Sequence, residues 1–275
     1  MNSQNESKIK LLLRNWPKGT LGTQSWLETL GVYRQLAEQY RASGWIKKID
    51  HGLYSLMDDQ ISWHGIIYTL QHQLDYKIHI AATTALDLQG YSHYLSLANA
   101  TLENAQRVWL FPSSLLFKPF PRWFIKHFYK QFNMRFVRTA LFTGDETRGL
   151  TTIQIENYQI TIAMPERAIL ESISLAPNKI SLQYIKELME GMTTLRPQIL
   201  QVLLEQCNSI KVKRLFLLIA EHLEHAWVKK LTLDKINLGR GKRMVGTGGY
   251  YYPKYQISLP IQLEQHEGYV DNDRT

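Results

Sequence analysis

Cysteine is almost absent from this chain of 275 residues: Cys207 is the only one. A single cysteine excludes an intramolecular disulfide framework and a cysteine-based zinc site. Long apolar runs are missing too, because the longest, such as 215–220, fall far short of the roughly 20 residues that span a bilayer. The polar start MNSQNESKIK lacks the apolar core of a secretion signal. We therefore expect a cytoplasmic protein with no membrane partner.

Acidic residues are fewer than basic ones, 24 against 32, which leaves a net charge of +8. This excess favours a polyanionic partner, either nucleic acid or an acidic protein surface, although plain solubility is the alternative. The charge is uneven: residues 118–140 hold six Lys/Arg and no Asp/Glu, and residues 211–243 hold nine against three. Neither glycine nor proline is enriched, so long disordered segments are not expected.

The first 60 residues follow the order of a winged helix. Apolar spacing predicts helices over 7–14, 23–30 and 33–42, with Thr23 as the cap of the second and Ser43-Gly44 ending the third. Two β-prone runs then flank Asp50-His51-Gly52, which predicts a hairpin. The sequence therefore predicts a winged helix-turn-helix DNA-binding domain over residues 1–60.

The rest of the chain divides into two further parts. Residues 61–176 alternate helical and β-prone patterns, including helices at 61–74 and from 83, strands at 78–81 and 107–111, and a hairpin at 152–163 turning at Asn157-Tyr158. Residues 177–275 begin with helical patterns at 181–190, 197–206 and 210–227 and end with a β-prone segment. The predicted fold class is α+β: a winged helix, a mixed α/β middle domain and a mainly helical C-terminal region.

The predicted recognition helix supplies the first candidate DNA contacts. Its first residues are expected near base edges, where Arg34 suits guanine and Gln35 suits adenine. Arg41 lies further along and is better placed for phosphate. The start of the preceding helix offers donors to phosphate, and the wing adds basic side chains. The complete set of candidates is Thr23, Gln24, Ser25, Tyr33, Arg34, Gln35, Arg41, Lys47, Lys48 and His51.

Three basic segments each allow a second interpretation. A winged helix can also bind protein, since Glu38 lies on the exposed face and the net charge of 1–60 is modest. In 118–140, aromatic and basic residues alternate, which fits either a second nucleic-acid surface or an amphipathic helix with an aromatic core; the second is favoured. Arg240, Lys242 and Arg243, in a glycine-rich stretch, form either a basic docking patch or a plain basic turn.

No motif predicts catalysis, a metal or a cofactor. His222 and His225 in EHLEH have no third ligand cluster and are expected to be solvated. Glu166 and Glu171 in PERAILES are expected to be cap and surface groups rather than a catalytic pair. The spacing of a Ser/His/Asp hydrolase is absent.

Several stretches together resemble the AbiEi family of antitoxins. The first is GVYRQLAEQYRASGWIKKIDHGLYSL, in which the similar positions are Tyr40, Ser43, Gly44, Trp45, Ile46, Gly52 and Tyr54. The others are TTALDLQGYSHYL, PERAILESI and the C-terminal INLGRGKRM followed by GGYYYPKYQISLP. Tyr33 departs from the family's pattern, which has a small hydroxyl residue at the start of the recognition helix.

The resemblance implies a type IV toxin–antitoxin system that defends against phage by abortive infection. In it, the winged helix binds inverted repeats in its own promoter, and the remainder neutralises a cognate AbiEii-type nucleotidyltransferase toxin. The patch of Arg240, Lys242 and Arg243 would face that toxin. The alternatives are a winged-helix regulator that senses a small ligand and a nucleic-acid-processing enzyme docked by the winged helix. A toxin-like neighbouring reading frame would favour the antitoxin.

Overall fold

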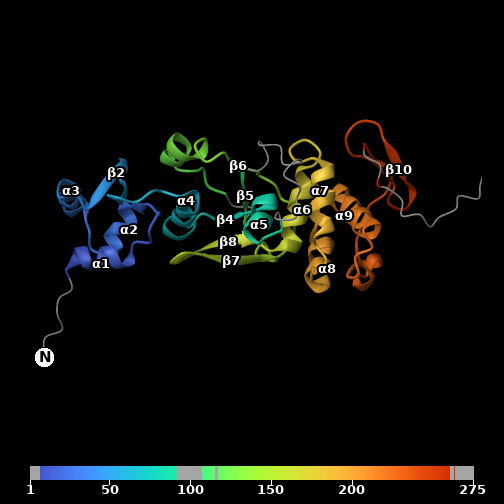
Figure 1. The fold of residues 1–275 in the computed structure, drawn as a ribbon, viewed down its shortest axis with the longest axis horizontal. Coiled ribbons are helices and arrows are strands. Elements are labelled where there is room, and N and C mark those ends of the chain that lie inside the picture. Colours follow the sequence, from blue (N-terminus) through green and yellow to red (C-terminus); the bar gives the residue numbers. More distant parts are fainter. Residues whose placement is uncertain (1–6, 92–106, 115–116, 261–262, 264–275) are drawn as a thin grey trace, which may run out of the picture. The chain divides into compact units, whose positions relative to one another are not determined.

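The computed structural model describes residues 7–91, 107–114, 117–260 and 263. These residues form two compact units (Figure 1). The first contains the described parts of 1–79, 110–137 and 151–162, and the second contains the remainder. Within the described residues, no helix is both long and apolar enough to cross a membrane. The fold class is the predicted mixture of α and β, while the three-part division of the sequence stays a prediction.

The first unit begins with a winged helix. Its elements, in chain order, are α1 (Lys8–Asn15), β1 (Gly22–Thr23), α2 (Gln24–Thr29), α3 (Arg34–Ala42), β2 (Ile46–Asp50) and β3 (Leu53–Leu56). The three predicted helices and the hairpin are therefore confirmed. The strand β1 was not predicted, and it pairs antiparallel with β3 to give the sheet order β1-β3-β2. The core consists of Leu12, Trp16, Leu27, Val32, Ala37, Ile46 and Tyr54.

A second helical segment is attached to this domain. The expected helix over 61–74 is confirmed as α4 (Trp63–Tyr68), which continues as a π-helix, η1 (Thr69–Gln73). Thr69 Oγ1 donates to Leu21 O at 3.2 Å, and the Gln73 amide donates to the same oxygen at 2.6 Å. A Cβ on Gly65 would lie 1.9 Å from Gly19 O, so only glycine allows this close approach. The winged helix is thus fastened to residues beyond 60.

Five strands form the larger sheet, in the order β6-β5-β4-β8-β7. They are β4 (Ile78–Ile80), β5 (Val108–Pro112), β6 (Met134–Phe136), β7 (Leu150–Ile155) and β8 (Tyr158–Ala163). The expected hairpin of β7 and β8 is confirmed, but its turn lies one residue earlier than predicted. Glu156 adopts a φ of +47°, a left-handed conformation that reverses the chain before Tyr158.

The second unit is organised around one buried helix, α6 (Pro165–Leu175), which contacts every other long helix of this unit. Those are α5 (Ala82–Leu88), α7 (Leu182–Glu190), α8 (Pro197–Gln206) and α9 (Ile210–His222). Glu166 and Glu171 were expected at the surface, and this was wrong: both side chains are buried. Glu166 pairs with Arg196 at 2.9 Å, and Glu171 pairs with Arg167 at 2.8 Å and accepts from Ala82 N.

The helix α9 ends at His222, five residues before its predicted end at 227. Glu224 has a φ of +53°, and the chain leaves the helix there. His225 Nε2 lies 2.7 Å from Met189 O, and Trp227 Nε1 donates to Met192 O at 2.9 Å. His225 is therefore buried and not solvated as expected. Tertiary hydrogen bonds replace the last helical turn that the apolar spacing predicts.

The β-prone end forms a small sheet of its own. Its strands are β9 (Arg243–Met244), β10 (Tyr250–Tyr252) and β11 (Ile257–Leu259), in the order β10-β11-β9. The connecting 3-10 helices are η3 (Val228–Lys230), η4 (Leu233–Lys235) and η5 (Pro253–Tyr255). Ile257 and Leu259 are buried, so one face of this sheet packs inward.

Candidate nucleic-acid interface

The helix α3 presents the predicted recognition face to solvent. Val32 and Ala37 are buried in the core, with Leu36 and Tyr40 packed against it. Tyr33 precedes the helix and is 64% exposed, and Arg34, Gln35 and Arg41 are exposed as well. The amphipathic pattern therefore leaves the first turn of α3, where Arg34 and Gln35 lie, open to a partner.

The start of α2 differs from the prediction. Thr23 and Gln24 are buried, and their hydrogen-bond donors are engaged within the first unit. Thr23 Oγ1 accepts from Trp26 N, which confirms it as the helix cap, while Thr23 N donates to Gln73. Gln24 N donates to Gly52 O, and its side-chain amide donates to Glu28 and Val32. The phosphate contacts of these two residues stay a prediction, and the exposed Ser25 is the most accessible of the three candidates at this helix start.

One acidic side chain links the recognition helix to the wing. Arg41 Nε donates to Glu38 at 2.6 Å, and Lys48 Nζ, on β2, lies 3.4 Å from the other oxygen of the same carboxylate. The hydrogen bond from Arg41 is the main cause that lowers the pKa of Glu38, against some desolvation. Arg41 and Lys48 thus share one negative charge, while Lys47 is exposed beside them.

The tip of the wing carries His51, which is exposed as predicted, next to a second carboxylate. Asp50 accepts from His51 N at 2.7 Å, His127 Nε2 lies 2.7 Å from its other oxygen, and Lys126 Nζ lies 3.4 Å away. The backbone hydrogen bond from His51, followed by the contacts of His127 and Lys126, lowers the pKa of Asp50 to about 2. Sequence reasoning did not place Lys126 and His127 at the wing, because they lie more than 70 residues away.

The basic-aromatic segment 118–140 contains the π-helix η2 (Phe124–Tyr129) and the strand β6. Phe124 and Phe128 are buried, and Phe117 stacks on Phe136 with ring centroids 4.4 Å apart. The aromatic side chains therefore form a core, as the favoured interpretation predicted. The basic residues of the segment stay exposed: Lys118, Arg122, Lys126, Lys130, Arg135 and Arg138.

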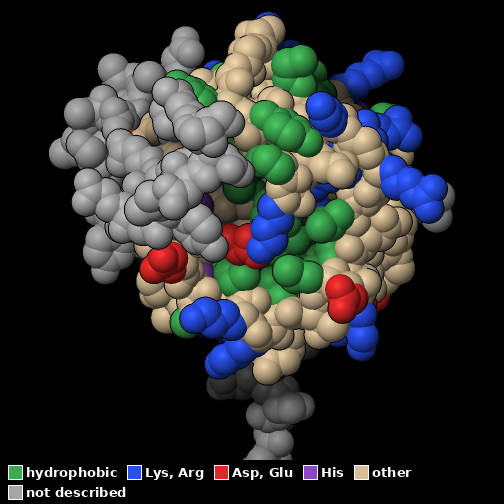
Figure 2. All heavy atoms as spheres, turned by 90° about the vertical axis from the view of Figure 1, so that its right-hand side faces the viewer, with side chains coloured by type: hydrophobic (Ala, Val, Ile, Leu, Met, Phe, Trp, Pro, Cys, Tyr) green, Lys and Arg blue, Asp and Glu red, His purple; other side chains and the backbone are tan. Residues whose placement is uncertain are grey.

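The second predicted patch is also exposed at all three positions, Arg240, Lys242 and Arg243. Arg214 of α9 is buried and donates to Leu238 O at 2.8 Å and Gly241 O at 2.7 Å, which fixes the loop that carries the patch. Exposed apolar side chains lie on the adjoining small sheet, namely Met244, Tyr250 and Tyr251. On this side of the molecule apolar groups gather near the centre, with Lys and Arg around them (Figure 2).

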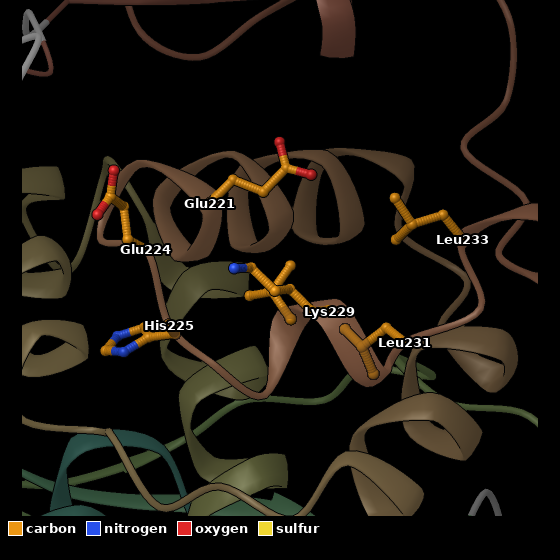
Figure 3. Close-up of a pocket in the computed structure, with 7 residues that line it drawn as sticks. Glu221, Glu224, His225, Lys229, Leu231 and Leu233 are labelled. Atoms are coloured by element: carbon orange, nitrogen blue, oxygen red, sulfur yellow. The ribbon is translucent and has the colours of Figure 1, made fainter. Parts of the chain in front are cut away.

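The second unit also contains a cavity of about 580 Å³. Glu221 and Glu224 lie on one side of it, and Lys229, Leu231 and Leu233 on the other (Figure 3). No group of three or more His, Cys, Asp or Glu side chains capable of holding a metal occurs among the residues that the structure describes.

Comparisons with known proteins cover nearly the whole chain. Residues 105–260 match the family of AbiEi antitoxins described as transcriptional regulators of type IV toxin–antitoxin systems, and residues 5–97 match the N-terminal domain of the same antitoxins. A crystal structure of the RV2827C protein from Mycobacterium tuberculosis shares the fold, with a TM-score of 0.56 and 14% identity over 91% of this chain and 89% of that one. No curated protein matched the chain. The chain belongs to the AbiEi family of antitoxins and transcriptional regulators of type IV toxin–antitoxin systems.

Proposed function

We propose that this chain represses its own operon by binding inverted repeats in the promoter, and that it neutralises a cognate nucleotidyltransferase-type toxin. The observation that carries the first role is the exposed first turn of α3 beside a basic wing. This is the arrangement with which a winged helix enters the major groove and contacts the flanking backbone. Membership of a family of antitoxin regulators supports both roles.

Arg34 and Gln35 are the proposed base-reading residues. Arg34 can donate two hydrogen bonds to guanine, and Gln35 can both donate to and accept from adenine. Lys47 and His51 on the wing, and Ser25 at the start of α2, are the proposed backbone contacts, since each is exposed. Tyr33, with most of its side chain exposed, adds an apolar contact next to the reading residues.

Fluorescence anisotropy of the full-length chain with a duplex from its own promoter tests the regulatory role. We expect binding to the promoter to be at least about a thousandfold tighter than to a shuffled duplex at physiological salt, the lower end of specific recognition. Equal affinity for the two duplexes would refute a sequence-specific repressor. The exposed side of α3 would then be better explained as a surface that binds another protein.

For the antitoxin role we propose Arg240, Lys242 and Arg243 as the toxin-facing patch. The support is their joint exposure on a loop fixed by Arg214, next to exposed Met244, Tyr250 and Tyr251. Tyrosine, methionine and arginine are enriched in the cores of protein interfaces. The basic side chains would speed the encounter with an acidic partner surface.

A further inference from the structure

Asp50 is an unusual residue for a DNA-contacting wing, because a carboxylate repels the phosphate backbone. The structure neutralises it from a distant part of the chain: Lys126 and His127, both on η2, reach its side chain at 3.4 and 2.7 Å. The side chain of Lys126 remains 68% exposed while making this contact. The wing tip and η2 therefore meet through one carboxylate, and a cation is left facing solvent beside it.

Exposed basic side chains lie within η2 and on either side of it, together with the exposed apolar Ile125. Arg122, Lys126 and Lys130 follow one another at intervals of four residues and are all exposed. Residues four apart on a helix lie on one side. The opposite side is anchored, since Phe124 and Phe128 are buried. No acidic residue occurs in the sequence from 118 to 140, so nothing within the segment offsets these charges.

A continuous series of contacts joins this side of η2 to the recognition helix. Glu38 of α3 contacts both Arg41 of the same helix and Lys48 of β2, and Asp50 at the end of that strand contacts η2. All of these residues belong to the first compact unit. When α3 lies in the major groove of a duplex and the wing contacts the adjacent backbone, the same duplex continues past the wing tip, where η2 lies.

We propose that η2 and the residues flanking it form a further DNA-contacting element, in which Arg122, Lys126 and Lys130 bind backbone phosphates beyond the wing, and that Asp50 holds η2 against the wing tip. This inference rests on the proposed DNA binding and adds to it a binding site outside the winged helix. The contacts are to phosphate, so they strengthen binding to every sequence alike and carry no base preference. A protein partner for this basic side is the competing explanation.

The test compares the full-length chain with the triple variant Arg122→Ala/Lys126→Ala/Lys130→Ala. Affinity for promoter and shuffled duplexes is measured from 50 to 300 mM salt. Each lost phosphate contact removes about 0.9 from the slope of log K against log salt. We expect the slope to fall by about 1.8 to 2.7 on both duplexes, because Arg122 and Lys130 each contribute a full contact while Lys126 is already paired with Asp50. The ratio of the two affinities should stay unchanged. The melting temperature checks that the variant is folded.

The matched control is Lys229→Ala/Lys230→Ala/Lys235→Ala, which removes the same charge from exposed positions of the second unit. An equal loss of slope in the control would overturn the proposal, because net charge alone would then explain it. An unchanged slope in the η2 variant would overturn it as well and favour a protein partner. If the unaltered chain binds promoter and shuffled duplexes equally well, the proposal of a sequence-specific repressor is wrong. The change in the salt slope on the shuffled duplex still tests separately whether η2 contacts DNA.

Discussion

Arg34 is the residue on which the proposed sequence specificity depends. Arg34→Ala should reduce the discrimination between promoter and shuffled duplex by about 1–3 kcal/mol, because a bidentate contact to guanine is lost. Anisotropy titrations with both duplexes measure this difference. Arg34→Lys is the matched control: it keeps the charge but loses the planar fork, so it should lose discrimination while keeping the affinity for shuffled DNA. If both variants still discriminated between promoter and shuffled duplex as the unaltered chain does, the wing rather than Arg34 would make the base contacts.

Glu171 is the residue whose loss should most destabilise the second unit. Its side chain is 0% exposed and pairs with Arg167, which is 6% exposed. Glu171→Gln removes the carboxylate that neutralises this guanidinium, which keeps its hydrogen bonds to Glu146 O and Arg148 O, so the free energy of unfolding should fall by about 3 kcal/mol. Glu190→Gln is the control, because Glu190 also pairs with a lysine four residues away, yet is 49% exposed. Chemical denaturation should show that the free energy of unfolding of this control falls by less than about 1 kcal/mol.

The residues that sequence reasoning misplaced share one physical cause. Glu171, His225 and Gln24 are polar, and polar side chains are usually exposed. In the structure a tertiary contact accompanies the burial of each. Ala82 N donates to the Glu171 carboxylate, the His225 ring lies against Met189 O, and the Gln24 side-chain amide donates to Val32 O while its backbone N donates to Gly52 O. Apolar periodicity carries no information about such partners. By contrast, the exposure of Arg34 and Gln35 follows directly from the burial of Val32 and Ala37 on the opposite side of α3.

At the scale of the element, we propose that the wing contacts the DNA backbone rather than the bases. Lys47→Ala should weaken binding to promoter and shuffled duplexes alike and lower the salt slope by about 0.9. Lys48→Ala should have a smaller effect, because Lys48 is already paired with Glu38 and its removal leaves Arg41 to neutralise that carboxylate. Salt titrations of the two single variants give the comparison. A larger effect for Lys48 would contradict the pairing seen in the structure.

The elements differ in how far the sequence predicts them. The helix α3 and the hairpin were predictable because their apolar spacing is regular and glycines mark their ends, with φ of +74° at Gly44 and +66° at Gly52. The strand β1 has only two residues and exists through its pairing with β3, so no local pattern indicates it. The contact between η2 and the wing is likewise a product of tertiary folding. Composition alone shows that the segment is basic, but not what it touches.

At the scale of the whole molecule, the two proposed roles need separate surfaces. A helix and wing held against DNA cannot also hold a toxin. The candidate DNA contacts lie in the first compact unit, and Arg240, Lys242 and Arg243 lie in the second. The winged helix is fastened to residues beyond 60 through Thr69 and Gln73, so substitutions in the full-length chain separate the roles more safely than truncation.

Two full-length variants should therefore show opposite defects. Arg34→Ala/Lys47→Ala/Lys48→Ala should lose promoter repression, measured with a reporter gene, while still rescuing growth when the cognate toxin is co-expressed. Arg240→Ala/Lys242→Ala/Arg243→Ala should repress normally and rescue growth less well, because the charges that speed encounter with the toxin are gone. Full rescue by the second variant would remove this patch from neutralisation. Loss of rescue in the first, with the protein folded and present at normal levels, would show that neutralisation requires the DNA-binding surface, and the division between the two units would be wrong.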